Sequence, residues 1–203
     1  IFQPLMIQVG QSINLLGSWL PNDVDFAKGE LPLAVTHLAN LEPFFSNNPW
    51  TAALEGKRVL VVHPFEKSIE KQYAKRELLF PSNPDLLPAF SLLTISPPQT
   101  LGGGSNVFAD WFDGLHDSFE RISKLEFDVA IVGAGAYGLP LGAWISRMGI
   151  PVVHLGGATQ LMFGIRGRRW EKSPTHRPLI NQHWVFPMDH EKPRGRVARN
   201  SYW

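Results

Sequence analysis

The chain has 203 residues, a formal net charge of +1, 44% hydrophobic and 18% charged residues, and no cysteine. These values are typical of a globular protein with one well-buried core; they exclude a disordered chain, disulfides and thiolate metal sites, and favour a reducing setting. No apolar run is long enough to span a bilayer and no signal peptide is recognisable, so we expect a cytoplasmic protein without a transmembrane segment.

The first half of the chain carries strand and helix signals in alternation. Residues 13–20 predict a strand, and a weaker apolar stretch follows at 33–38. A short helix that Gly56 ends comes next. The β-branched run 58–63 (RVLVVH) is typical of a strand buried on both faces of a parallel sheet. Ser68 and Pro81 mark the start and the stop of a further helix.

The second half repeats this alternation more clearly. A strand at 90–95 precedes an amphipathic helix that begins near Asn106, whose apolar residues recur at helical spacing as far as Ile122. The remaining signals are a strand at 127–133, a helix at 137–149 and a strand at 151–157. Strands that alternate with helices predict an α/β fold: a Rossmann-like, doubly wound, mostly parallel sheet with helices on both faces.

Domain organisation follows from where these signals fade. We expect a single α/β domain over residues 1–203, with 1–40 as an incomplete N-terminal part and 165–203 as an irregular, basic C-terminal wrap. The chain begins Ile1-Phe2-Gln3 without a methionine, which favours a piece excised from a longer protein.

The C-terminal segment is strongly basic. Between residues 166 and 199 stand nine Lys or Arg and three acidic residues, a net charge of +6 against −5 for the rest. Such a segment suits an anionic partner, and the alternative is a solvated basic tail. No nucleic-acid-binding module is recognisable, so we expect no nucleic acid as partner.

A glycine-rich turn follows the strand at 127–133. Gly133, Gly135 and Gly138 satisfy the G-x-G-x-x-G pattern of dinucleotide-binding proteins, but the next strand ends at His154 to Gly157 without the acidic residue that would bind a ribose. A nicotinamide or flavin enzyme is therefore disfavoured. The turn still allows a phosphate to approach the backbone; the alternative is a turn needed only for strand–helix packing.

Polar residues follow several of the predicted strands. Because ligands of open parallel sheets bind at the carboxyl ends of the strands, His63, His154 and the two glycine turns are expected to converge there. The alternative for each histidine is a hydrogen-bonded structural role. Gln72 and Arg76, one helical turn apart, form a further candidate pair, with a surface salt bridge as the alternative for Arg76.

Metal and nucleophile signals are weak. Asp23-Val24-Asp25 resembles a D-x-D metal motif but lies in a turn-rich segment where such triplets occur by chance. No His, Asp and Glu cluster has reliable ligand spacing, and no nucleophile elbow is present. We therefore assign no metal site and no certain cofactor, and leave dependence on Mg²⁺ or Mn²⁺ open.

Several blocks in order give the chain a family resemblance: EPFFSNNPW, GKRVLVVHPFEKSIEKQYAKRELLF, FDVAIVGAGAYGLPLGAWISRMG, HLGGATQLMFGIRGRRW, NQHWVFP and a final YW. From Leu41 to Trp203 the chain resembles a group of proteins associated with capsular and other surface-polysaccharide biosynthesis, often fused to glycosyltransferase domains. The part around DVAIVGAGAYG and GIPVVHLGG is similar to GT-D-type glycosyltransferases. Their acidic D-x-E signature is missing here; Asp23-Val24-Asp25 does not match it.

The resemblance implies a glycosyltransferase, or a glycosyltransferase-like domain, that uses a nucleoside-diphosphate sugar and a glycan or lipid-linked acceptor. On this view three groups of residues bind the donor: Gly133, Gly135, Tyr137 and Gly138 at the first turn, Gly156, Gly157 and Gln160 at the second, and Arg166, Arg168 and Arg169 at the phosphates. His63 is the first candidate for a general base, followed by His154 and Glu66. The alternatives are a non-catalytic nucleotide- or glycan-binding module and, third, a Rossmann methyltransferase or dehydrogenase.

Overall fold

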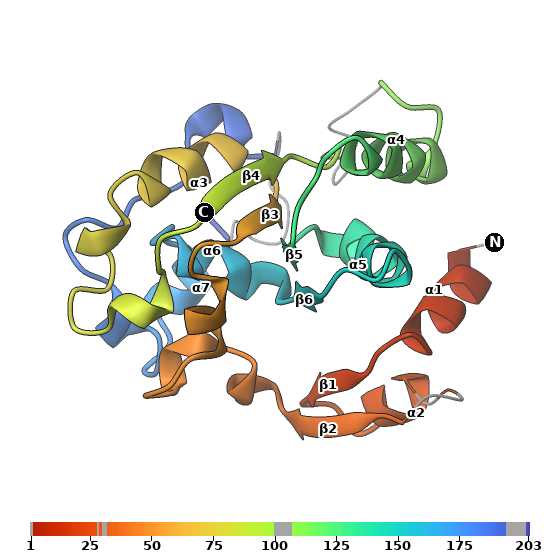
Figure 1. Cartoon of the computed structure of the whole chain (residues 1–203), viewed down its shortest axis with the longest axis horizontal. Helices are drawn as coiled ribbons and strands as arrows, with labels where there is room; N and C mark the ends of the chain where they lie inside the picture. Colours follow the sequence, from red (N-terminus) through yellow and green to blue (C-terminus); the bar gives the residue numbers. More distant parts are fainter. Residues whose placement is uncertain (1, 28, 30–31, 100–106, 194–201) are drawn as a thin grey trace.

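The computed structural model describes residues 2–27, 29, 32–99, 107–193 and 202–203. Its centre is a four-stranded, all-parallel sheet in the order β4-β3-β5-β6 (Figure 1). The strands are β3 (Arg58–Val62), β4 (Ser91–Ile95), β5 (Val129–Val132) and β6 (Val152–His154). The predicted α/β fold with a doubly wound parallel sheet is confirmed.

Helices cover both faces of this sheet. Val59 and Val61 of β3 pack in one hydrophobic core with Ile69 of α3 (Glu66–Tyr73) and with α6 (Thr159–Met162). Leu60 and Val62 point to a second core, which α4 (Trp111–Ser123) and α5 (Gly138–Arg147) complete. This alternation explains why the run in β3 is apolar without a break. Full burial of each such side chain stabilises the fold by about 1.5–3 kcal/mol.

Two helix boundaries differ from the sequence expectation. α4 begins at Trp111 because the Asp110 carboxylate accepts hydrogen bonds from the N–H groups of Phe112 (2.7 Å) and Asp113 (3.0 Å). α3 was expected to start at Ser68 and continue to Phe80, but it spans Glu66–Tyr73 and a separate 3-10 turn follows. Ser68 is not its N-cap.

The N-terminal part has a small sheet of its own. β1 (Leu15–Ser18) pairs in parallel with β2 (Ala34–His37), and these strands do not join the central sheet. α1 (Phe2–Gly10) packs against α5, and α2 (Asp23–Ala27) lies beside β1 (Figure 1). Whether this part belongs to a larger N-terminal unit stays a prediction.

The Asp23-Val24-Asp25 triplet lies in α2. The Asp23 carboxylate accepts hydrogen bonds from Ser18 Oγ and from the N–H groups of Trp19 and Leu20 at 2.9–3.1 Å. The hydrogen bond from Leu20 is the largest of the influences that lower its pKa. The Asp23 carboxylate therefore stabilises the turn between β1 and α2 by accepting these hydrogen bonds.

Between β6 and residue 193 the described chain is mostly irregular, apart from α6 and α7 (Arg168–Glu171). It is tied back to α3 and its following turn: the Gln72 amide donates to the carbonyls of Gly164 (2.9 Å) and His183 (3.1 Å), and Trp184 Nε1 donates to Leu79 O (3.2 Å). Short 3-10 turns connect the elements elsewhere: η1 (Leu38–Asn40), η2 (Pro43–Phe45), η3 (Trp50–Leu54), η4 (Arg76–Leu78), η5 (Pro84–Leu86), η7 (Gly135–Tyr137), η8 (Gly156–Ala158), η9 (Arg177–Leu179) and η10 (Asp189–Glu191).

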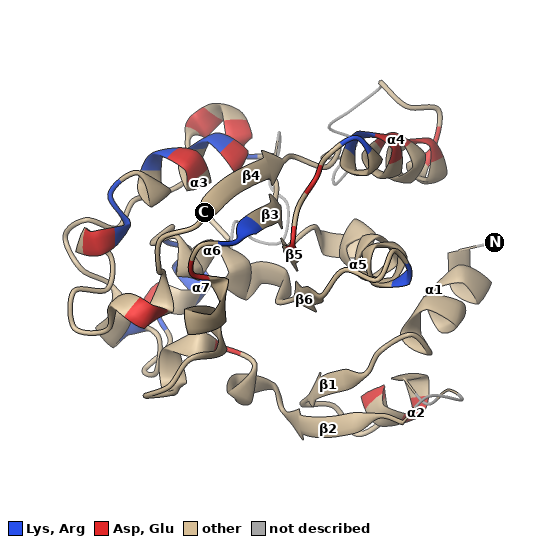
Figure 2. Ribbon diagram, in the orientation of Figure 1, with Lys and Arg blue, Asp and Glu red and all other residues tan. Residues whose placement is uncertain are grey.

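Charge is unevenly distributed over the helices. Figure 2 shows Lys, Arg, Asp and Glu along α3 and α4, whereas α5 carries Arg147 alone. The loops that follow β5 and β6 (133–137 and 155–158) contain no charged residue. Of the basic segment 166–199, residues 194–199 lie outside the described part of the chain.

Candidate functional site

A cavity of about 720 Å³ opens at the carboxyl ends of the central strands. After β3 the chain crosses to β4 on one side, and after β5 it crosses to β6 on the other, so neighbouring strands β3 and β5 form the switch point of the sheet. Crevices at such points are where open α/β sheets bind ligands, and this volume is in the usual range for small-molecule sites.

Seven parts of the chain supply the cavity walls. The loops after β3, β4, β5 and β6 contribute His63, Pro64, Phe65, Pro97, Pro98, Gln99, Gly133 to Tyr137 and His154 to Ala158 together with Gln160. Trp19, Leu38, Leu41 and Glu42 come from the N-terminal region, Trp111 comes from α4, and Arg169, Trp170, Pro193, Tyr202 and Trp203 come from the C-terminal region. The walls are therefore mainly apolar and aromatic.

The three glycines of the first turn are needed for different reasons. A Cβ at Gly133 would lie 2.6 Å from Thr159 Oγ1 and equally close to the carbonyl of Gly156, so the two loops touch here. A Cβ at Gly138 would collide with the His154 imidazole. Gly135 has φ +54° and nothing within 4 Å of where a Cβ would be, so its backbone faces open space.

The second turn repeats the Gly135 arrangement. Gly156 has φ +56° and again nothing within 4 Å of an added Cβ. Within the described part of the chain, the backbone N–H groups of Gly135, Ala136, Gly156 and Gly157 have no hydrogen-bond acceptor. Two facing turns thus bring unpaired donors to one cavity, which is the arrangement that anion-binding backbone turns use.

The three predicted arginines are not brought together. Arg169 lines the cavity, donates to Tyr202 Oη (3.1 Å) and stacks on the ring of Trp170. Arg166 is paired with Glu171 and lies over the ring of Phe186, and Arg168 is exposed; neither lines the cavity. Arg169 is the one cation among the lining residues that the structure describes.

His63 follows β3 directly and is 4% exposed. Its Nδ1 accepts a hydrogen bond from the N–H of Phe65 (3.0 Å), which places the proton of the neutral ring on Nε2. Burial lowers its pKa to about 3. At neutral pH this imidazole offers a hydrogen-bond donor to the cavity, and the geometry does not favour it as a general base.

His154 ends β6 in the cavity wall, against Gly138. Its side chain keeps contact with solvent, but the surrounding protein atoms lower its pKa by desolvation. No hydrogen bond joins either ring nitrogen to a described residue. A neutral ring with an available nitrogen can accept a proton, so His154 is better placed for base chemistry than His63.

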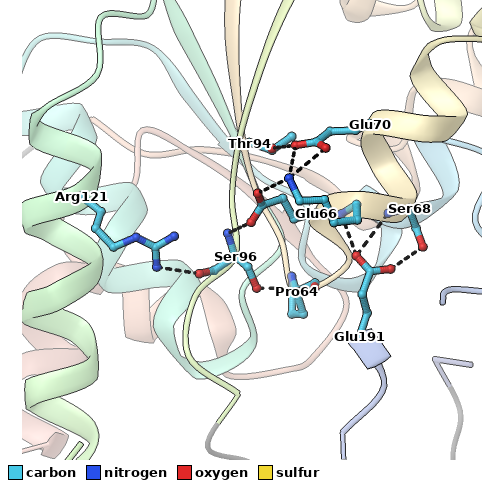
Figure 3. A network of polar contacts seen from close by, with 9 residues as sticks. Pro64, Glu66, Ser68, Glu70, Thr94, Ser96, Arg121 and Glu191 are labelled. Atoms are coloured by element: carbon cyan, nitrogen blue, oxygen red, sulfur yellow. Dashed lines mark hydrogen bonds and ion pairs between the residues drawn. The ribbon is translucent and has the colours of Figure 1, made fainter. Parts of the chain in front are cut away.

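Glu66 does not line the cavity. Its carboxylate accepts a hydrogen bond from the N–H of Ser96 (2.9 Å) and pairs with Lys67 (3.1 Å), which joins the start of α3 to the end of β4 (Figure 3). Nearby, the carboxylate of Glu191, which is 6% exposed, accepts hydrogen bonds from the N–H groups of Lys67 (2.7 Å) and Ser68 (3.2 Å). This capping role was invisible in the local sequence.

Gln72, Arg76 and Gln160 have structural contacts. Gln72 is buried and holds the C-terminal segment, and Arg76 pairs with Glu77 on η4; neither lines the cavity. Gln160, which is 1% exposed, does line it, but its amide nitrogen lies within hydrogen-bonding distance of the carbonyls of Ile165, Arg166 and Tyr202 at 3.0–3.2 Å.

Aromatic side chains make up much of the remaining wall. Tyr137, 4% exposed, stacks in parallel on Trp111, with ring centroids 5.0 Å apart and an interplanar angle of 9°. Trp170 contacts Tyr202 edge to face at 5.6 Å. Trp111, Tyr202 and the acidic residue Glu42 were missed by the sequence analysis, because nothing in their local patterns distinguishes them from core or surface residues.

Among the residues that the structure describes, no group of three or more His, Cys, Asp or Glu side chains is placed to hold a metal ion. Each helix of the described part of the chain is too short or too polar to cross a membrane. Comparison with protein-family models, curated proteins and solved structures finds no match for the chain.

Proposed function

We propose that this chain binds a nucleoside-diphosphate sugar in the cavity and acts as a glycosyltransferase or glycosyltransferase-like domain. The acceptor in this proposal is a glycan or a lipid-linked glycan of surface polysaccharide or glycoprotein synthesis. A cytoplasmic location and companion glycosyltransferase domains in the same chain belong to the same proposal.

The observation that carries the proposal is the pair of positive-φ glycines in facing turns. Gly135 and Gly156 both lack a neighbour where a side chain would be, and both turns present unpaired N–H groups among the described residues. A diphosphate is compact, strongly anionic and rich in acceptors, so it matches two converging sets of backbone donors.

Arg169 and the aromatic walls support the same ligand class. The planar guanidinium can donate two parallel hydrogen bonds to a phosphate, and Tyr202 Oη already holds it at the cavity. Trp111, which is partly exposed, lines the cavity with an apolar ring of the kind that binds bases and sugar rings, and Tyr137 stacks behind it.

The chemistry would proceed by attack of an acceptor hydroxyl on the anomeric carbon as the nucleoside diphosphate departs. Preorganised N–H groups stabilise the charge that develops on the leaving diphosphate, and loss of one such donor typically costs about 3 kcal/mol of activation free energy. We assign proton acceptance to His154 ahead of His63, because the Nδ1 atom of His63 is already bonded to Phe65.

The test is a ligand panel on the full chain. Thermal unfolding with UDP, GDP and dTDP, beside NAD and S-adenosylmethionine, should show stabilisation by at least one nucleoside diphosphate. Stabilisation by NAD or S-adenosylmethionine alone would contradict the proposal and favour a Rossmann dehydrogenase or methyltransferase.

Two adjacent arginines give a matched pair of variants for the diphosphate that binds. Arg169→Ala should weaken its affinity about tenfold, since a charge-assisted hydrogen bond contributes about 1.5–3 kcal/mol. Arg168→Ala removes the same charge from an exposed neighbour that does not line the cavity, and should leave the affinity unchanged. Calorimetric titration measures both; equal losses would argue against a phosphate subsite at Arg169.

A non-catalytic nucleotide- or glycan-binding module is the second candidate, and the state of His63 favours it. A buried imidazole with a pKa of about 3 is a weak base. A measurement of nucleoside diphosphate released from its sugar conjugates distinguishes the two candidate functions. An enzyme releases the diphosphate catalytically, and His154→Ala should abolish this release. A binding module binds the conjugate without turnover.

A further inference from the structure

One carboxylate lines the cavity among the residues that the structure describes. Glu42 precedes η2 and shares its wall with Trp19, Leu38 and Leu41 of the N-terminal region. With Arg169 as the single lining cation of that part, the cavity carries one positive and one negative side chain. A ligand with an anionic end and a neutral, hydrogen-bond-donating end is complementary to this distribution.

The Glu42 carboxylate is held in place by a residue far along the chain. Its Oε2 lies 2.7 Å from Nε2 of His176, and both side chains are mostly buried, at 13% and 15% exposed. The other ring nitrogen, Nδ1, lies 2.8 Å from Ser173 Oγ and 3.1 Å from Thr175 Oγ1. When these hydroxyls donate to Nδ1, the proton on Nε2 points to Glu42.

The second oxygen of Glu42 is differently placed. No described residue donates a hydrogen bond to Oε1, although the side chain lines the cavity. A carboxylate with one oxygen anchored and the other open is a strong acceptor for a ligand hydroxyl. Trp19, which is 62% exposed, adds an apolar ring to the lining of the same cavity.

We infer that Glu42, positioned by His176, accepts hydrogen bonds from hydroxyls of the ligand's sugar and selects neutral over acidic sugars. The inference deepens the proposed function and rests on it. In this inference the phosphates bind at Arg169 and the glycine turns, where charges attract, and the sugar contacts Glu42. A carboxylate on the sugar would face Glu42, and like charges in a mainly apolar cavity repel strongly.

The experiment compares each nucleoside diphosphate with its sugar conjugates on the full chain. Calorimetric titrations with UDP, UDP-glucose, UDP-galactose and UDP-glucuronate, and with GDP and GDP-mannose, give the affinity added or lost by each sugar. In the wild type we expect a neutral conjugate to bind more tightly than its parent diphosphate, and UDP-glucuronate more weakly than UDP-glucose.

Glu42→Gln keeps the size of the side chain and an acceptor for His176. It should reduce the affinity for the neutral conjugate about tenfold, leave the diphosphate affinity within about twofold, and narrow the discrimination against UDP-glucuronate. His176→Asn should lower the same conjugate-to-diphosphate ratio less. Glu55→Gln, which removes a charge from an exposed site outside the cavity, serves as the control.

The ratio of the two affinities is insensitive to any unfolded fraction, so a destabilised variant remains informative. If no nucleoside diphosphate binds the wild type, the proposed function fails and this inference fails with it. If diphosphates bind but no conjugate binds more tightly than its diphosphate, or Glu42→Gln weakens both equally or neither, the inference alone is overturned.

Discussion

The segments that follow β3 differ from those that follow β5 and β6 in whether the protein itself supplies an acceptor for their backbone N–H groups. At the start of α3, the N–H groups of Lys67 and Ser68 are bonded by the buried Glu191 carboxylate, so the protein supplies its own anion. After β5 and β6, the N–H groups of Gly135 and Gly156 have no acceptor among the described residues. The comparison teaches where to expect a ligand anion: at the open turns and not at α3.

The largest expected effect concerns the contact between the two open turns. Gly133→Ala places a Cβ against the Gly156 carbonyl and Thr159, and neither backbone can move without shifting a strand end. We expect a loss of about 3 kcal/mol in the free energy of unfolding, measured by urea denaturation.

Gly135→Ala is the control for that variant. Its Cβ enters open space, so the cost is limited to a left-handed backbone, about 1 kcal/mol. If the two alanine variants lose the same stability, the turns do not pack as described.

The contacts of Glu191 at the start of α3 predict an intermediate effect on stability. Glu191→Ala leaves the N–H groups of Lys67 and Ser68 without their acceptor in a mostly buried place, and should cost about 2 kcal/mol in urea denaturation. Asp189→Ala, two residues away with an exposed carboxylate, should stay within about 0.5 kcal/mol of the wild type. Unchanged stability in Glu191→Ala would contradict the view that the N–H groups at the start of α3 depend on Glu191 as their acceptor.

His63 predicts how stability changes with pH. Its folded-state pKa of about 3 lies below the unfolded value of about 6.5, so the unfolded chain binds the additional proton. Stability from this residue is present above pH 6.5 and is lost as pH falls toward 3, by about 1.4 kcal/mol per pH unit in that window. His63→Gln should reduce the dependence of the free energy of unfolding on pH in this range. If the slope between pH 6 and 4.5 is the same in the variant and the wild type, His63 is not buried in its neutral form.

The sequence predicted the fold better than the functional site, and the physical reason is the range of the contacts. β3 and β5 are readable because each is buried on both faces and therefore apolar without a break. The turn at Gly135 could be predicted because it directly follows a strand. The expected pairing of Gln72 and Arg76 relied on one continuous helix, whereas α3 ends at Tyr73.

The roles of the other polar residues could not be predicted because they depend on partners distant in the chain. Glu66 was predicted as a candidate acid or base; its carboxylate accepts a hydrogen bond from the N–H of Ser96, 30 residues away. Glu42 is held by His176, 134 residues away. Such pairs leave no periodic or spacing signal, so one sequence cannot reveal them.

The central claim is that the unpaired N–H groups of the turns at Gly135 and Gly156 bind a diphosphate. An amide NMR titration of the full chain with UDP or GDP tests it most directly. The account predicts large shifts for the N–H resonances of Gly135, Ala136, Gly156 and Gly157, and none for Lys67 and Ser68, whose donors Glu191 already holds. Saturable binding that shifts Lys67 and Ser68 but leaves the four turn amides unmoved would contradict it, as would the absence of any binding.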